Sequence, residues 1–390
     1  MKNKPLLTAN EGVKPIVATF FLLFVSLVLT VICSCSGGST NSVSGGDTLQ
    51  LKYAKNLCMV RHDGYTIVTM ADPWHKDKTL HRYVLASDSA IERGGLPEGT
   101  VIRTPMRSAV VFTTIHSSLF LSLGARDIIK GVCDLRYIKL PWIQEQCRLG
   151  RIKDCGSGMS PDIEKIIDTK PDAILLSPFE NSGGYGKLEE VDIPIVECAD
   201  YMENSPLARA EWMRFFGMLT GHEREADSMF NAVEQRYLAL KETAEKTKSR
   251  PSVVIDKKSG GVWYVAGGQS TMGTLIDDAG GQYVFASEKK SGSIAMPFEA
   301  VLDRAGQADI WLMRYSSDHP LTLRELLSEH EGYGQMKAYR QGRVYGCNTK
   351  TSLFFEESLF WPDRLLADFI SIIHPEVEGI GEARYFQLLK

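Results

Sequence analysis

The residues with the most reactive side chains are scattered along the sequence rather than grouped into a catalytic motif. No two of the eight histidines are spaced to form a pair on one helical face (His62, His75, His81, His116, His222, His319, His330 and His374). The sequence also lacks a GxSxG nucleophile elbow, a Walker A phosphate loop and an HExxH metal motif. These absences argue against a dedicated metal site built from several histidines, and they favour a binding protein over an enzyme.

One cysteine near the N-terminus stands in a context that predicts covalent lipid attachment. An almost unbroken apolar run over residues 16–33 follows a lysine-containing start and leads into Ile32-Cys33-Ser34-Cys35. This ending is similar to the lipobox of bacterial lipoproteins, because an aliphatic residue lies three positions before Cys35 and a small residue immediately before it. We predict cleavage before Cys35 and attachment of diacylglycerol to its thiol. The alternative is an uncleaved anchor. Both interpretations place the rest of the chain outside the cytoplasm. Neither determines which membrane holds the anchor or on which face the protein lies.

Six further cysteines follow Cys35, with no CxxC pair and no spacing typical of a zinc site (Cys58, Cys133, Cys147, Cys155, Cys198 and Cys347). In an exported protein, a disulfide among Cys133, Cys147 and Cys155 is one expectation. The alternative is that these cysteines are small core residues with free thiols.

Composition limits the classes of protein that this chain can belong to. The 390 residues carry a net charge of −4, with 44% hydrophobic and 24% charged residues, which is a globular balance. The length suffices for two domains. The pI near 6.1 indicates no excess of basic residues that could bind the phosphates of a nucleic acid, so we do not expect nucleic acid as a partner.

Apolar periodicity predicts the elements that would position a site. After short strands at 51–53, 65–70 and 82–85, β and α segments alternate, with strands at 109–112, 128–132, 173–176 and 195–198 and a helix at 117–124. The alternation resumes after residue 251, with strands at 253–255, 262–265, 310–313 and 344–345 and helices at 272–279, 321–327 and 357–373. Short apolar strands alternating with helices predict an α/β fold with mostly parallel sheets.

A long helix is predicted between these two β/α regions. Ser205 and Pro206 begin a helix that ends before Gly221. A second helix over 223–246 carries apolar residues three and four positions apart, which form one continuous stripe. Such a helix can link two lobes, and the alternative is a long surface helix packed on one domain.

A weak internal repeat pairs two glutamates. Residues 163–168 hold Glu164 and lead to an apolar strand, and residues 298–303 hold Glu299 and lead to a second such strand. Each glutamate is followed by an aspartate four residues later. The repeat indicates two related halves.

Several of these segments together are similar to one family of proteins. They are Ser205–Trp212, the long helix, Gly267-Gly268, Asp278–Gly281, Ser291–Ser293 before Phe298-Glu299, and Pro362–Asp368. They resemble the ABC-transporter solute-binding proteins with a helical backbone, the class that delivers ferric siderophores, haem and vitamin B12. The resemblance covers about residues 105–376. Residues 48–100 match it less well, and their role stays open.

The resemblance implies two α/β lobes with central, mostly parallel sheets, joined by one long α-helix, with the ligand cleft between the lobes. The implied parts are a signal peptide over 1–34, a tether over 35–47, an N-terminal α/β lobe with an extra β segment over 48–204, linking helices over 205–250 and a C-terminal α/β lobe over 251–390. It also implies that Glu164 and Glu299 dock on a membrane permease.

Ligand-binding residues are expected in the loops that end the strands. The candidates are His116, Arg136, Tyr137, Tyr201, Trp263, Tyr264, Ser293 and Phe354, and the loop Phe179-Glu180-Asn181 is also expected at the cleft. Because Trp263 and Tyr264 are adjacent on one strand, they point to opposite faces, so at most one contacts ligand from mid-strand.

The predicted function is that of a lipid-anchored extracytoplasmic component of an ABC importer. It would capture an iron-siderophore-type chelate and pass it to the permease, with no catalytic residue, metal site or cofactor of its own. A cobalamin or haem ligand is the alternative within the class. An extracytoplasmic enzyme on a two-lobed scaffold is a distant alternative, and turnover of the ligand would distinguish it. The sequence leaves the choice of chelate or corrinoid open.

Overall fold

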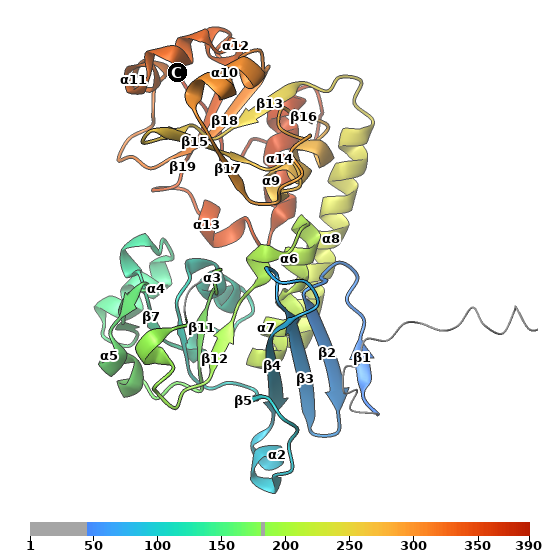
Figure 1. The fold of residues 1–390 in the computed structure, drawn as a ribbon, viewed down its shortest axis with the longest axis vertical. Helices are drawn as coiled ribbons and strands as arrows, with labels where there is room; N and C mark the ends of the chain where they lie inside the picture. Colours follow the sequence, from blue (N-terminus) through green and yellow to red (C-terminus); the bar gives the residue numbers. More distant parts are fainter. Residues whose placement is uncertain (1–44, 181–183) are drawn as a thin grey trace, which may run out of the picture. The chain divides into compact units, whose positions relative to one another are not determined.

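A computed structural model of the chain describes residues 45–180 and 184–390. The predicted signal peptide, the lipid-attachment residue Cys35, most of the predicted tether and Asn181 lie outside the described residues. Figure 1 shows the helices and strands with their labels.

An N-terminal sheet comes first along the chain. Its strands follow the order β1-β2-β3-β4-β5, antiparallel except for the parallel pair β4–β5. The bounds are β1 Asp47–Leu49, β2 Leu57–His62, β3 Tyr65–Ala71, β4 Thr79–Ala86 and β5 Thr100–Arg103, with helix α2 at Asp88–Arg93. The predicted strands at 65–70 and 82–85 are confirmed within β3 and β4.

The strand predicted at 51–53 is wrong. The backbone N–H groups of Lys52, Tyr53 and Ala54 donate to the carboxylate of Glu211 at 2.8, 2.7 and 2.8 Å. Because a side chain takes these donors, they are not available for a ladder with a neighbouring strand. The apolar residues of this segment therefore belong to a loop that wraps around one carboxylate.

The first lobe is built on a parallel sheet with the order β12-β11-β6-β7-β8. Its strands are β6 Ala109–Val111, β7 Ile129–Val132, β8 Lys153–Asp154, β11 Ala173–Leu176 and β12 Ile195–Glu197. A short hairpin pairs β9 Gly156–Ser157 with β10 Ser160–Pro161. The helices are α3 Thr114–Ser122, α4 Pro141–Arg148 and α5 Ile163–Asp168. Four of the five strands, β6, β7, β11 and β12, lie where their apolar runs predict them.

Three linking helices follow the first lobe. They are α6 Pro206–Glu211, α7 Met213–Thr220 and α8 Glu223–Glu245. Ser205 caps α6 as predicted, because its side chain accepts from the N–H of Ala208. Gly221 ends α7 in the left-handed conformation at φ 73°. The predicted long helix is confirmed as α8, which has 23 residues. Figure 1 shows α8 running alongside both lobes.

The second lobe is built on a five-stranded sheet with the order β16-β13-β18-β19-β20, parallel except for the edge strand β20. These strands are β13 Ser252–Ile255, β16 Gln282–Tyr283, β18 Ile310–Tyr315, β19 Val344–Asn348 and β20 Gln387–Leu388. A second, antiparallel sheet pairs β14 Lys258–Ser259, β15 Val262–Ala266 and β17 Ser293–Met296.

The helices of the second lobe depart from the sequence prediction at one place. They are α9 Thr271–Asp278, α10 Phe298–Ala305, α11 Leu323–Glu329, α12 Lys337–Arg340, α13 Phe354–Glu357 and α14 Pro362–Ile373. The helix predicted over 357–373 begins later, as α14 at Pro362, because proline suits the first turn of a helix and disfavours the helical conformation of the residue before it. The two lobes with mostly parallel sheets, joined by a long helix, match the predicted fold class.

Two hydrophobic clusters hold the described residues together. The larger one draws side chains from the N-terminal sheet, both lobes and the linking helices. The smaller one packs Val110, Ile166, Ile174 and Leu188 on one face of the first lobe's sheet. The N-terminal sheet therefore shares its core with the rest of the fold.

The structure contains no disulfide among Cys133, Cys147 and Cys155, contrary to one of the two expectations from the sequence. Cys133, Cys147 and Cys155 are free thiols, as are the other cysteines in the described part of the chain. Cys133 and Cys155 are buried in the smaller cluster, so they act as core residues rather than a disulfide. Cys58, by contrast, is exposed on β2.

Within residues 45–180 and 184–390, no helix has the length and apolar character needed to cross a membrane.

Candidate functional site

A cavity of about 630 Å³ lies in the first lobe where β6, β7 and β11 end. Ligands in open α/β sheets bind at the carboxyl ends of the strands. Two of the predicted ligand loops contribute to the wall, through Asp134 and Phe179, whereas none of the eight predicted ligand residues lines it. The remaining lining is mainly apolar, with a few polar groups (Phe112, Gly158, Met159, Ser160, Pro161, Ile163, Leu176, Ser177, Gly184, Tyr185, Gly186, Lys187 and Leu188). Two sequence-predicted loops are therefore brought together at one edge of the first lobe's sheet, and all the lining residues of this cavity belong to that lobe.

Asp134 gives this edge a fixed shape. It adopts a left-handed backbone conformation with φ 52°, and its carboxylate accepts the N–H of Gly158 at 3.0 Å. Aspartate tolerates this conformation better than most residues do, because its short side chain bonds locally. Asp256 follows β13 in the second lobe with φ 61°, and the guanidinium of Arg314 donates to both its oxygens at 2.9 and 2.7 Å. Each lobe thus has an aspartate-stabilised turn beyond a strand.

The wall residue Tyr185 is held by a network that reaches the N-terminal sheet. Its hydroxyl donates to Glu197 Oε1 at 2.6 Å, and Glu197 Oε2 lies 3.0 Å from His81 Nδ1. The other ring nitrogen of His81 lies 2.8 Å from the hydroxyl of Thr100. Burial raises the pKa of Tyr185, and its bond to the Glu197 carboxylate raises it further, so the phenol stays a proton donor. The extra N-terminal segment therefore positions one wall of the cavity.

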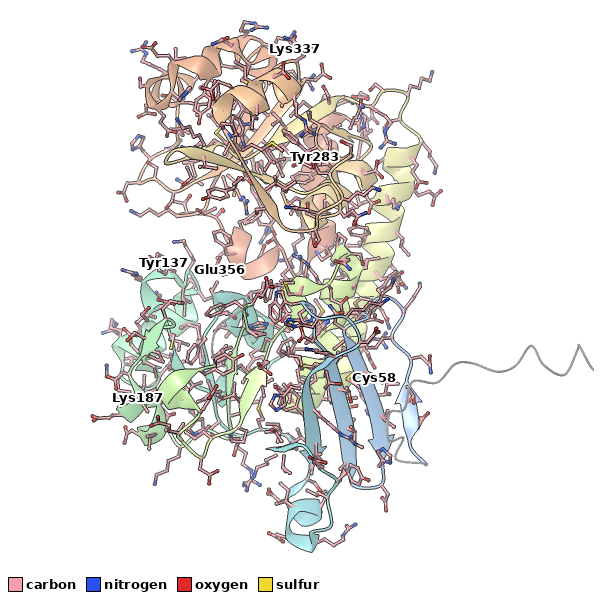
Figure 2. The ribbon with its side chains drawn as sticks, viewed as in Figure 1. Cys58, Tyr137, Lys187, Tyr283, Lys337 and Glu356 are labelled. Carbon is pink, nitrogen blue, oxygen red and sulfur yellow. The ribbon has the colours of Figure 1, made fainter. Side chains whose placement is uncertain are left out.

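A glutamate of the second lobe contacts the first. Glu356 in α13 accepts from the hydroxyl of Thr114 at 3.1 Å and from the N–H of Lys139 at 3.0 Å. Its side chain is buried, and Figure 2 shows it between the lobes near Tyr137. These bonds join the start of α3 and the start of α4 to the second lobe.

Four of the predicted ligand residues are exposed and available to a ligand. Arg136 and Tyr137 follow β7, and the Arg136 guanidinium lies 4.5 Å from the centre of the Tyr137 ring. In the second lobe, Tyr264 on β15 is 52% exposed, and Ser293 on the paired strand β17 is exposed as well. The structure thus leaves an aromatic and a polar group accessible in each lobe.

Tyr201 lies at a smaller cavity of about 190 Å³. Residues of the linking region and of the second lobe line it together (Met202, Glu203, Asn204, Arg209, Gln269, Ser270, Thr271, Ser291 and Gly292). Its hydroxyl donates to the carbonyl of Pro178. Tyr201 is therefore separate from the larger cavity.

Three predicted ligand residues are buried in this structure and do not reach the surface. Trp263 is 0% exposed and donates its indole N–H to the carbonyl of Ile255 at 3.1 Å. Phe354 is 4% exposed, whereas its neighbour Phe355 is 51% exposed. His116 is also 0% exposed. In each case the side chain points into the core, because the parity of a strand or the turn of a helix decides which neighbour faces outward.

The two predicted docking glutamates occupy equivalent places. Glu164 lies in the first turn of α5 and Glu299 in the first turn of α10, and both side chains are exposed. A shallow groove beside Glu299 is lined by Phe298, Leu302 and His330, among others. The geometry leaves both carboxylates accessible to a partner.

Sequence reasoning did not find the supporting residues of the cavity. Glu197 closes β12, but its partners His81 and Tyr185 come from distant positions in the chain. No spacing rule connects these three residues. Asp134 was easier to place from the sequence, because it lies in the loop after β7 that also holds the predicted ligand residues Arg136 and Tyr137.

Comparisons with known proteins agree with this architecture. A family model described as periplasmic binding protein matches residues 115–351. The uncharacterized lipoprotein MJ0878 of Methanocaldococcus jannaschii is 27% identical over 361 residues, with 86% of this chain and 84% of that protein covered. The petrobactin-binding protein YclQ of Bacillus subtilis is 25% identical over 239 residues, with 60% of this chain and 62% of that protein covered.

A solved structure shows the same fold. A periplasmic haem-binding protein from Pseudomonas aeruginosa is similar with a TM-score of 0.57 at 16% identity, covering 72% of this chain and 96% of that chain. The family model covers more than half of the sequence, and the two lobes with a helical link are present. The chain therefore belongs to the periplasmic binding protein family.

Proposed function

We propose that this protein is a lipid-anchored, extracytoplasmic binding protein that captures a metal chelate of the iron-siderophore type and delivers it to an ABC permease. The observation that carries the proposal is the cavity of about 630 Å³ at the carboxyl ends of β6, β7 and β11. Sites for small organic ligands commonly enclose about 300–1,000 Å³ and combine apolar walls with a few polar groups.

The chemistry of the accessible residues favours a large, partly apolar ligand over a bare ion. Tyr137, Phe179, Tyr264 and Phe355 are each about half exposed, and aromatic side chains of this kind can cover a large apolar ligand. Arg136 adds a cation that suits the negative charge of a ferric catecholate or carboxylate chelate. The petrobactin-binding relative supports a siderophore, although it shares only 25% identity.

A haem or a cobalamin is the second candidate. The structural similarity to a haem-binding protein favours haem, and the same aromatic side chains suit a planar macrocycle. Both alternatives use the same cavity, so one set of titrations distinguishes them.

The test is a titration of the purified protein with ferric catecholate siderophore, ferric hydroxamate, haemin and cobalamin. We expect one of these ligands to bind with micromolar or tighter affinity, in a one-to-one complex that is recovered chemically unchanged. Phe179→Ala should weaken that binding about 5- to 150-fold, since losing an aromatic contact costs about 1–3 kcal/mol. Leu238→Ala is the matched control, because Leu238 is exposed on α8 outside the cavity. Binding of all four no tighter than millimolar would refute the proposal, and turnover of the ligand would indicate an enzyme.

The second prediction concerns docking on the permease through Glu164 and Glu299. The double variant Glu164→Ala, Glu299→Ala should lower ligand uptake by cells while leaving the affinity of the purified protein unchanged, because both side chains are exposed outside the cavity. Each exposed ion pair contributes about 1 kcal/mol or less, so the double variant should lose more uptake than either single one. Glu242→Ala with Glu245→Ala, two exposed acids on α8, controls for the change in net charge. Normal transport by the Glu164/Glu299 double variant would exclude the docking role.

Lipid anchoring is tested at Cys35. Cys35→Ala should abolish metabolic labelling by a fatty-acid probe and release or mislocalise the protein, since the thiol is the attachment point. Cys33→Ala is the control and should keep the label. Equal labelling of wild type and Cys35→Ala would show that the anchor lies elsewhere.

A further inference from the structure

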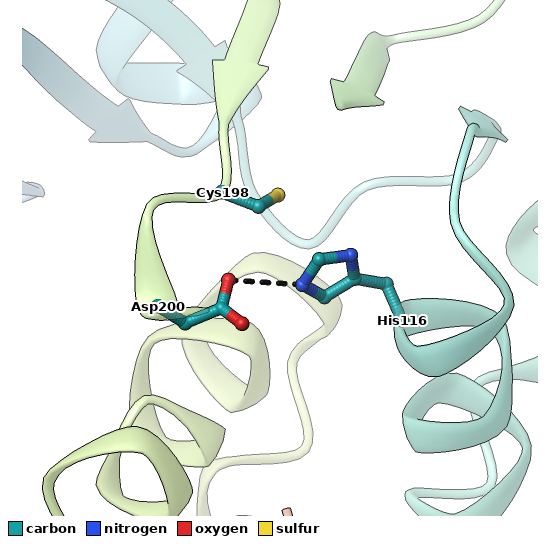
Figure 3. Close-up of side chains that lie close together, drawn as sticks. All are labelled: His116, Cys198 and Asp200. Carbon is teal, nitrogen blue, oxygen red and sulfur yellow. Dashed lines mark hydrogen bonds and ion pairs between the residues drawn. The ribbon is translucent and has the colours of Figure 1, made fainter. Parts of the chain in front are cut away.

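Three potential metal ligands meet in the interior of the first lobe. His116 lies in the first turns of α3, and Cys198 and Asp200 follow the end of β12. Their ligand atoms all lie within 4.8 Å of one another, and all three side chains are buried. Figure 3 shows the imidazole facing the thiol and the carboxylate of the opposite segment. Nitrogen, sulfur and oxygen donors thus converge from two elements that are distant in sequence.

Both ring nitrogens of His116 have polar partners. Nε2 lies 3.0 Å from Asp200 Oδ1, and Nδ1 is bonded to the hydroxyl of Thr113. With Nε2–H donating to the Asp200 carboxylate, Nδ1 accepts from Thr113. A cation bound at Nε2 would replace the Nε2 proton, and Nδ1–H would then donate to Thr113, the kind of outer partner that metal-binding histidines have.

The cluster lies among buried acidic side chains. Glu203 is 2% exposed and Asp200 is 1% exposed. Carboxylates in such a low-dielectric environment favour a cation bound beside them.

We propose that His116, Cys198 and Asp200 form a binding site for one divalent transition-metal ion, with zinc as the preferred ion. The mixed nitrogen, sulfur and oxygen set suits zinc, whose tetrahedral sites hold ligands about 2.0–2.3 Å from the ion. The ligand atoms would have to move inward by about 1 Å to reach that geometry. On binding, the thiol releases its proton to solvent and no electrons are transferred. The three proposed ligands do not line the cavity, although their neighbour Thr113 does, and the proposal does not depend on the identity of the cargo.

The experiment measures bound metal in the full-length protein, purified without a polyhistidine tag. After incubation with Zn²⁺ and removal of free ion, wild type should retain one zinc per chain by elemental analysis. With Co²⁺ in place of zinc, a thiolate-to-cobalt charge-transfer band should appear in the near ultraviolet. Cys198→Ser and Asp200→Asn should lower zinc affinity at least about 100-fold, and Thr113→Val should lower it about 10- to 100-fold.

Matched variants separate this site from other thiols and from cargo metal. Cys133→Ser removes another fully buried thiol of the same sheet and should leave the zinc content and the cobalt band unchanged. Phe179→Ala alters the cavity and should also leave them unchanged. Because the cluster is buried, the measurement is repeated after unfolding and refolding with Zn²⁺ present. Absence of zinc from wild type in both preparations, or an identical cobalt band in Cys198→Ser, would overturn the proposal.

Discussion

Glu211→Ala should destabilise the protein by about 3–5 kcal/mol, because the substitution leaves one buried and two partly buried N–H donors without their partner. Glu211 is 1% exposed and accepts the N–H groups of Lys52, Tyr53 and Ala54 at 2.7–2.8 Å. These bonds attach the loop between β1 and β2 to α6. We expect the midpoint of chemical denaturation to fall, and hydrogen exchange to increase first in residues 47–62.

The control for this prediction lies in the same contact between the N-terminal sheet and the linking helices. Glu223 pairs with Arg61, but both side chains are about half exposed. Glu223→Ala should therefore cost about 1 kcal/mol or less. If the two variants are equally stable, the N-terminal sheet does not depend on the buried carboxylate.

Trp263→Ala should also cost about 3–5 kcal/mol of stability, as is usual when a large aromatic side chain is removed from a core. Its ring is fully buried and stacks on Trp311 with centroids 5.6 Å apart. Because Trp263 does not reach the surface, the ligand affinity of the variant that remains folded should equal that of wild type. Urea unfolding and ligand titration measure the two quantities separately.

Tyr264→Ala, at the adjacent position, should have the opposite effect: ligand affinity falls while stability changes little. Tyr264 is 52% exposed, so its removal should change stability little. If the ligand contacts β15, the affinity should fall about 5- to 150-fold, as expected for a lost aromatic contact. A loss of affinity in Trp263→Ala with unchanged stability would contradict the placement of these two side chains.

The fold was largely predictable because its strands are short apolar runs separated by helices. The segments around Ala173–Leu176 and Ile310–Tyr315 are buried on both faces, and such strands keep a continuous apolar signal. The strand predicted at 51–53 failed because Glu211, far along the chain, takes its backbone donors. Local pattern contains no information about such a distant partner.

The candidate site was predictable only at the level of loops. Parallel strands bring their carboxyl ends to one edge, so the loops holding Asp134 and Phe179 could be placed together. Which of two neighbouring aromatics faces outward depends on strand register, and the sequence left that choice open for Trp263 and Tyr264. The cluster of His116 and Asp200 joins residues 84 positions apart, a pairing that no motif encodes.

The exposed thiol of Cys58 has a practical consequence for building a sensor from this protein. In a chain that starts at Gly45, Cys58 is exposed, Cys147 is partly covered, and the other cysteines are buried. Figure 2 shows Cys58 on the N-terminal sheet, well apart from the cavity residue Lys187. A maleimide linker at Cys58 would therefore fix every molecule to an electrode or glass surface in one orientation, with the binding cavity open to the sample.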